Sequence, residues 1–94
     1  MVLKYPVDLV PEPEGRIMAK VKDVPSVYAE GDNRNEALEM VLSVLLDLFD
    51  FNYFEHRRPV PLPSYFEGED YVVVPEEITQ KIMDFNSRLE VLVS

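Results

Sequence analysis

The chain has 94 residues, 47% of them hydrophobic and 11% aromatic, which is the apolar content of one folded domain and not of a disordered chain. Eighteen Asp and Glu against nine Lys and Arg give a formal net charge of −9. Because DNA and RNA are bound largely through Lys and Arg, this balance argues against nucleic-acid binding. It favours a basic protein partner, although acidity alone also serves solubility.

The chain has no cysteine, which excludes disulfides, thiolate zinc sites and thiol catalysis and fits a cytoplasmic protein. The N-terminus lacks the long apolar segment of a signal peptide and meets Pro6 early. The longest apolar stretch, Val41 to Phe54, is interrupted by Asp47 and Asp50, so we expect no membrane span.

Three short strands are predicted in the first third of the chain. Residues 4–10 and 16–22 alternate between apolar and polar side chains, and 27–30 form a shorter third strand. The proline-containing segments 11–15 and 23–26 are turns. Connections this short predict an antiparallel meander.

A long helix is predicted from Asn33 to about Phe54, because Asn33 followed by Glu36 is a variant of the capping box. Its polar positions form one narrow stripe, which leaves two apolar flanks. One flank is expected to pack on the sheet, and the other on a dimer partner or on the second helix.

The last third of the chain predicts a fourth strand and a second helix. The strand, residues 70–74, contains an apolar run without alternation, which indicates an interior strand or one buried by association. Pro75 opens a helix that continues to the end. The predicted class is α+β, a three-stranded antiparallel meander plus a fourth strand, packed by one long helix, with a C-terminal helix (βββαβα). We expect a single domain, 1–94, with a core at 1–68 and a possible dimerisation element at 69–94.

In their order and in their residues, these segments resemble the HicB antitoxin family in its longer enterobacterial form. No single motif is strong, but the ordered set covers nearly the whole chain. Its pieces are Tyr5-Pro6-Val7, Pro13-Glu14-Gly15, Asp23-Val24-Pro25, Gly31-Asp32, Glu36-Ala37, Phe49-Asp50-Phe51, Phe54-Glu55, Pro61-Leu62-Pro63-Ser64 and Val74-Pro75.

The resemblance implies a partial ribonuclease H-like fold without an active site. It also implies an antitoxin that binds and covers HicA, a small basic ribonuclease that cleaves mRNA. The family usually adds a C-terminal DNA-binding module for autoregulation. This sequence ends at Ser94, about where that module would begin, so we expect no direct nucleic-acid binding by this chain. Whether Ser94 is the natural end stays open.

Catalytic and metal sites are not expected. His56 is the only histidine, and it lies beside two arginines without an obvious nucleophile. Asp8, Asp47 and Asp50 are candidates for a ribonuclease H metal cluster, but Asp47 and Asp50 belong to the polar helix stripe and Asp8 alternates away from its apolar neighbours. The segment 70–75 with its helix also resembles the start of a ribbon-helix-helix, yet it offers valines where that motif needs polar side chains. We predict no catalytic residue, no metal and no cofactor.

Two groups of residues are predicted to form contacts. Acidic side chains at turns and strand ends, with one aromatic between them, would meet a basic toxin: Glu12, Glu14, Tyr28, Glu30 and Asp32. Solvated loop charge is the alternative for each acid, and a core position is the alternative for Tyr28. A homodimer or higher oligomer would use Val72, Val74, Ile78, Ile82, Phe85 and Leu89.

The predicted function is an antitoxin that neutralises a HicA-like toxin by occluding it. The rival interpretations are an orphan or phage-borne adaptor of the same fold that binds another protein, a transcriptional autoregulator, and a residual Mg²⁺-dependent nuclease.

Overall fold

Four strands and two helices follow one another in the order βββαβα, and a π-helical segment continues the first helix. The computed structural model describes residues 2–93, and the side chains of residues 2–89. The order and class confirm the predicted α+β fold. The elements are β1 (Lys4–Pro11), β2 (Ile17–Val21), β3 (Tyr28–Gly31), α1 (Arg34–Leu48), η1 (Phe49–Phe54), β4 (Tyr71–Val73) and α2 (Glu76–Val93).

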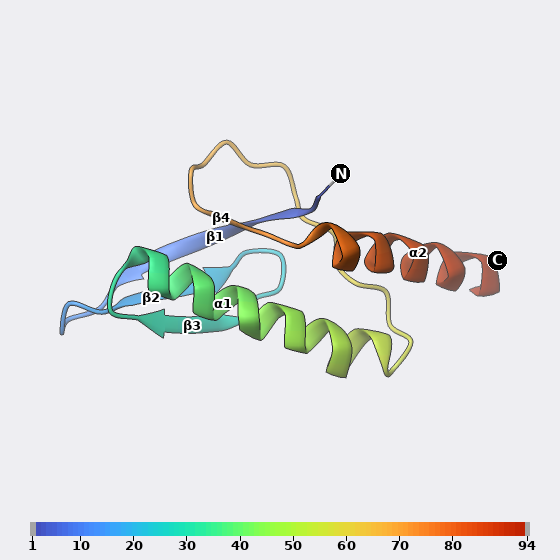
Figure 1. Ribbon diagram of the computed structural model, residues 1–94, viewed down its shortest axis with the longest axis horizontal. Helices are drawn as coiled ribbons and strands as arrows, with labels where there is room; N and C mark the ends of the chain where they lie inside the picture. Colours follow the sequence, from blue (N-terminus) through green and yellow to red (C-terminus); the bar gives the residue numbers. More distant parts are fainter. Residues whose placement is uncertain (1, 94) are drawn as a thin grey trace.

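The strands form one antiparallel sheet in the order β3-β2-β1-β4. Helix α1 lies along one face of this sheet, and α2 extends from β4 beyond the end of the sheet (Figure 1). Strand alternation turns Tyr5, Ala19 and Val21 toward α1, where all three are fully buried. Lys4, Asp8 and Lys20 occupy the opposite, outer face. The predicted meander of the first three strands is therefore confirmed.

Strand β4 is an edge strand, and the expectation of an interior position is wrong. It pairs only with β1, and its side chains alternate: Val72 is buried, whereas Tyr71 and Val73 are 37% and 40% exposed. The valine run gave no visible period because both of its faces are apolar. Alternation in burial comes from the sheet, which has α1 on one face only.

The start of α1 is held by the predicted cap. The Asn33 side chain accepts a hydrogen bond from the Glu36 backbone N–H at 2.9 Å, and Glu36 Oε1 accepts one from the Asp32 N–H at 3.3 Å. Just before this cap, Gly31 lies so close to the helix that a Cβ there would be 2.4 Å from the backbone nitrogen of Ala37. The first turn of α1 thus rests directly on the end of β3.

The first helix ends in a wider turn. The Glu55 N–H donates to the carbonyl of Asp50, five residues back, which is the π-helical pattern of η1. This turn presents Phe49 to Tyr5 at a ring-centroid distance of 5.8 Å, and Phe54 to Phe85 of α2 at 4.9 Å. The π-helical segment therefore joins the sheet core to α2.

An extended segment, residues 59–64, leads from η1 toward β4 and is held by side chains from α2, from β1 and from the loop between β2 and β3. Asn86 of α2 donates to the Val60 carbonyl and accepts from its N–H, at 3.0 and 2.8 Å. The Tyr5 hydroxyl donates to the Pro61 carbonyl at 2.7 Å. Asp23 accepts from the Ser64 backbone N–H at 2.9 Å. The prolines leave this segment few backbone donors, so side chains supply the hydrogen bonds that a neighbouring strand would supply in a sheet.

We expect the stability of the fold to fall at alkaline pH through Tyr5. Burial of its phenol, with a smaller contribution from the Asp23 carboxylate, raises the Tyr5 pKa well above its ordinary value. In the unfolded chain the Tyr5 phenol has a pKa of about 10, so the unfolded state loses this proton first. The free energy of unfolding therefore declines as pH rises past that point. Urea unfolding at several pH values from neutral to alkaline measures the decline.

The control for this prediction is Tyr5→Phe, which removes the ionisable group and the hydrogen bond to Pro61. The variant should be less stable at neutral pH by about 1 kcal/mol. Its stability should fall less steeply than that of the wild type above about pH 10, because it has lost the shifted group. Parallel curves for the two proteins would contradict the assignment.

Candidate functional site

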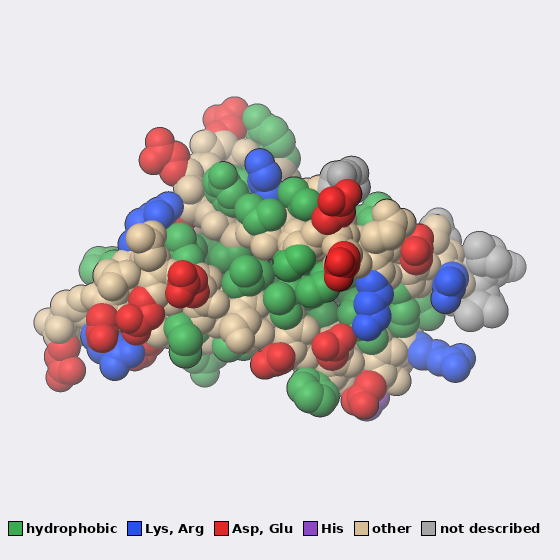
Figure 2. All heavy atoms as spheres, in the orientation of Figure 1, with side chains coloured by type: hydrophobic (Ala, Val, Ile, Leu, Met, Phe, Trp, Pro, Cys, Tyr) green, Lys and Arg blue, Asp and Glu red, His purple; other side chains and the backbone are tan. Residues whose placement is uncertain are grey.

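The predicted acids meet at one end of the sheet, where the β1–β2 turn lies beside the end of β3. Glu12, Glu14 and Glu30 line a common hollow of about 240 Å³. Gly15, with a positive φ of 83°, closes the turn that carries the first two of these residues. Figure 2 shows acidic side chains gathered around a basic one at this end of the molecule (left in the view). We call Glu12, Glu14, Glu30 and Asp32 the acidic end.

Arg16 lies within the acidic end, and the sequence analysis missed it. Its Nε is 3.8 Å from a carboxylate oxygen of Glu30 and 3.8 Å from one of Asp32. All three side chains are about half exposed or more, so these ion pairs add little stability. One positive charge among four negative ones leaves the acidic end with a net negative field, directed at solvent.

Tyr28 is a surface residue of an edge strand, and it does not belong to the core. Its side chain is 59% exposed on β3, which pairs only with β2. It alternates with Ala29, whose side chain turns toward the core, and shares a face with Glu30. The predicted aromatic contact residue therefore lies next to the acidic end, on an open edge of the sheet.

A second exposed surface, for which a dimer partner or the second helix was predicted as the occupant, lies on α1 and η1. The flank that packs on the sheet carries Ala37, Val41, Leu45 and Phe49, all fully buried. The other side presents Met40, Val44 and Phe51, which are 50%, 38% and 62% exposed. The spacing of residues 40, 44, 47 and 51 places Asp47 among them on one side of the helix. We call Met40, Val44, Asp47 and Phe51 the helix stripe.

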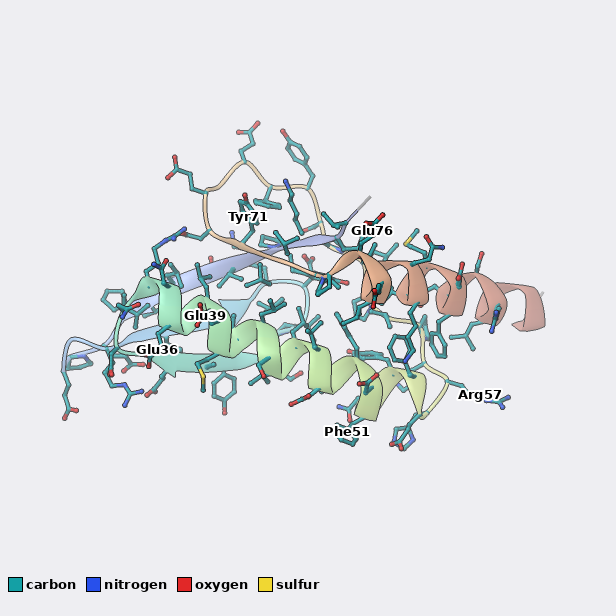
Figure 3. The ribbon with its side chains drawn as sticks, in the orientation of Figure 1. Glu36, Glu39, Phe51, Arg57, Tyr71 and Glu76 are labelled. Atoms are coloured by element: carbon teal, nitrogen blue, oxygen red, sulfur yellow. The ribbon has the colours of Figure 1, made fainter. Side chains whose placement is uncertain are left out.

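The second helix does not cover the helix stripe, although the sequence analysis allowed that it might. Contacts with α2 come from η1 on its other side, through the Phe54 and Phe85 rings and the Asp50–Lys81 ion pair at 3.6 Å. In Figure 3, Phe51 points away from α2. In the described part of the chain, the helix stripe faces solvent.

The residues weighed for catalysis lie apart. His56 is exposed beyond η1. Asp8 pairs with Lys22 at 3.4 Å on the outer face of the sheet, whereas Asp47 and Asp50 lie on the helix that covers the other face. Among residues 2–89, whose side chains are described, no three His, Asp or Glu side chains gather as a metal site requires. Nor is any helix among residues 2–93 long and apolar enough to cross a membrane.

The residues predicted for dimerisation divide into two groups. Val72, Val74 and Ile82 are buried within a single chain, where they join the same core as Tyr5. Ile78, Phe85 and Leu89 on α2 are partly buried. A dimer built on this region would use the partly buried positions and the exposed Tyr71 and Val73. Dimerisation itself stays a prediction.

Fold and surface together define a small α+β domain with an acidic end, an open sheet edge and an exposed apolar helix side. Residues 4–83 match the family model described as HicB_like antitoxin of bacterial toxin-antitoxin system. The chain is 41% identical over 88 residues to Antitoxin HicB 1 of Photorhabdus laumondii and 37% identical over 89 residues to Antitoxin HicB of Escherichia coli K12. The chain therefore belongs to the HicB-like antitoxin family, as the resemblance predicted.

The alignments cover 94% of this chain in both cases, but they cover 56% of the Photorhabdus relative and 64% of the Escherichia relative. The chain thus spans less than two thirds of the length of these two antitoxins. The matched region contains the whole sheet, α1 and η1, and so includes both the acidic end and the helix stripe.

Proposed function

We propose that this chain is the toxin-binding part of an antitoxin and that it neutralises a small basic HicA-like ribonuclease by covering it. The observation that carries the proposal is the match of residues 4–83 to the HicB-like antitoxin family. The acidic end supports the proposal, because a solvated group of carboxylates attracts a basic protein and speeds its capture. In this proposal the chain acts by binding, without catalysis or cofactor, in the bacterial cytoplasm.

A homodimer is the second part of the proposal. Tyr71 and Val73 are exposed on the open edge of β4, and apolar edge strands of this kind pair readily with another chain. A dimer would present two acidic ends and bind two toxin molecules. Light scattering of the purified chain measures its mass in solution. A monomeric mass at high protein concentration would overturn the proposed homodimer without affecting the proposed toxin binding.

The test is co-expression with the small basic protein encoded beside this chain's gene. We expect the chain to copurify with that protein and to restore the growth of cells in which it is toxic. Glu12→Lys with Glu14→Lys should slow association and weaken its dependence on salt, because the steering charge is reduced. Glu67→Lys with Glu69→Lys is the control, since it makes the same change in net charge on the exposed loop before β4.

Absence of both copurification and rescue would overturn the proposed function. That result would favour the adaptor interpretation, in which a protein of the same fold binds a different partner. Equal effects of the two charge reversals would instead show that total charge, and not the acidic end, governs association.

A further inference from the structure

The outer edge of β3 offers unpaired backbone groups. The Val21 N–H donates to the Val27 carbonyl at 3.1 Å, so the backbone groups of Val27 face β2. Because the residues that bond to a neighbouring strand alternate along an antiparallel ladder, the next ones to face β2 are Ala29 and Gly31. The N–H and C=O of Tyr28 and Glu30 therefore point away from β2. No described strand lies on that side. Such an edge is a template for one further strand.

The helix stripe lies on the same side of the molecule as this edge. Helix α1 runs across β3, and β4 with α2 lies on the opposite side of α1 (Figure 1). Phe51 points away from α2 (Figure 3), and Met40 and Val44 share its side of the helix. Neighbouring strands are about 4.8 Å apart, so a strand added to β3 would lie on the side of α1 that carries the stripe.

The charge of this surface selects the kind of partner. From Asn35 to Glu55 the chain has five acids and no Lys or Arg. Neither Glu39 nor Asp47 forms an ion pair with any residue in the described part of the chain. Over the middle of α1, the space-filling view shows acidic and hydrophobic side chains (Figure 2). A segment that is apolar on one face and basic on the other matches this pattern, whereas a nucleic acid is repelled by it.

We propose that an extended segment of the basic toxin joins the sheet as a fifth strand, antiparallel or parallel to β3, and packs its apolar side chains beneath the helix stripe. This inference rests on the proposed function and names the surface that performs it. The backbone groups of Tyr28 and Glu30 would supply the hydrogen bonds. Met40, Val44 and Phe51 would bury the partner's inward side chains, and Asp47 would meet its Lys or Arg at the rim.

The first test removes the edge donor without disturbing the ladder. Tyr28→Pro eliminates an N–H that faces solvent, which is a position where an edge strand tolerates proline. We expect it to weaken binding of the toxin encoded by the adjacent gene by about tenfold or more. Tyr28→Ala, which also removes the exposed ring but keeps the N–H, is the matched control. A circular dichroism spectrum and melting curve for each variant show whether the fold is retained.

The second test removes the apolar contact. Phe51→Ser should weaken the same interaction by about tenfold or more, because exposed aromatic side chains dominate such contacts. Tyr65→Ser, which alters an 87% exposed aromatic on the loop before β4, should leave binding unchanged. Both side chains are mainly solvated, so the folded state should survive in either variant.

The third test uses methionine methyl groups as reporters. Met40 lies on the helix stripe, whereas Met83 lies on α2. In a titration of methyl-labelled chain with the toxin, the Met40 resonance should shift or broaden and that of Met83 should not. This readout needs no mutation and so is independent of the folding of any variant.

The outcomes separate the inference from the proposed function. If the wild-type chain does not bind the toxin, the proposed function fails and the inference fails with it. If the wild type binds, but Tyr28→Pro and Phe51→Ser bind equally well and Met40 is unmoved, only the inference is overturned. If the chain alone forms a dimer that Tyr28→Pro dissociates, the fifth strand comes from a second copy, which also overturns it.

Discussion

Replacing Gly31 with alanine is expected to destabilise the fold by about 3 kcal/mol, at the upper end of what overpacking costs. A Cβ at this position would lie 2.4 Å from the Ala37 nitrogen and 2.8 Å from its Cα. These are backbone atoms at the first turn of α1, so no side chain can rotate to relieve the contact. The helix has to move away from the sheet, and its cap with it.

Thermal and urea unfolding measure this effect, and a loss of about 3 kcal/mol in a domain of this size lowers the Tm by roughly 10–20 °C. Gly68→Ala is the matched control. Its Cβ would meet nothing within 4 Å, so its stability should stay within about 0.5 kcal/mol of the wild type. Equal stability of the two alanine variants would show that α1 does not rest on β3 as described.

Features with local causes were predictable from the sequence. The cap at Asn33, the turn closed by Gly15 and the alternation of β1 and β2 each depend on residues within a few positions of one another. Strand β3 was expected at 27–30 and occupies Tyr28–Gly31, a difference of one residue. Such boundaries depend on where the ladder to the next strand ends, which a single sequence does not specify.

Features with long-range causes were not predictable. The position of β4 at an edge follows from its pairing with β1, about 65 residues earlier in the chain, and its apolar run carries no sign of this. The first helix, continued by η1, ends at Phe54 as predicted, but nothing in the sequence marks its wider π-helical end. Arg57 adopts a positive φ of 52° where a glycine would be the usual signal, and the Arg58 N–H bonds the Tyr53 carbonyl at 2.9 Å.

The candidate site shows the same division. Acids at turns and strand ends could be picked out individually, but their convergence with Arg16 requires the β1–β2 turn to lie beside the end of β3. The two apolar flanks of α1 were visible in the sequence as well. Which flank the fold leaves uncovered depends on α2 meeting η1 through Phe85, and this contact joins residues far apart in the chain. Spacing therefore predicted a second apolar flank, but not which of its side chains the fold leaves exposed.

Phe49 and Phe51 allow stability and binding to be separated within one helical segment. Phe49 is fully buried, with ring centroids of Tyr5 and Tyr53 at 5.8 and 6.4 Å, so Phe49→Ala should cost about 4 kcal/mol. Small domains are stable by only about 5–15 kcal/mol, so this substitution should remove a large part of the free energy of unfolding and lower the melting temperature strongly. Phe51 is 62% exposed, and Phe51→Ala should change stability by no more than about 0.5 kcal/mol.

Unfolding curves for the two alanine variants test the difference, and toxin binding by Phe51→Ala completes the comparison. A variant that keeps its melting temperature but loses affinity identifies a side chain exposed for contact with a partner, because a structural role would lower both. Comparable destabilisation by both substitutions would mean that the π-helical segment is covered on both sides, and the helix stripe would then be part of the core. The contrast follows from the geometry of η1, in which residues two positions apart face the sheet and the solvent.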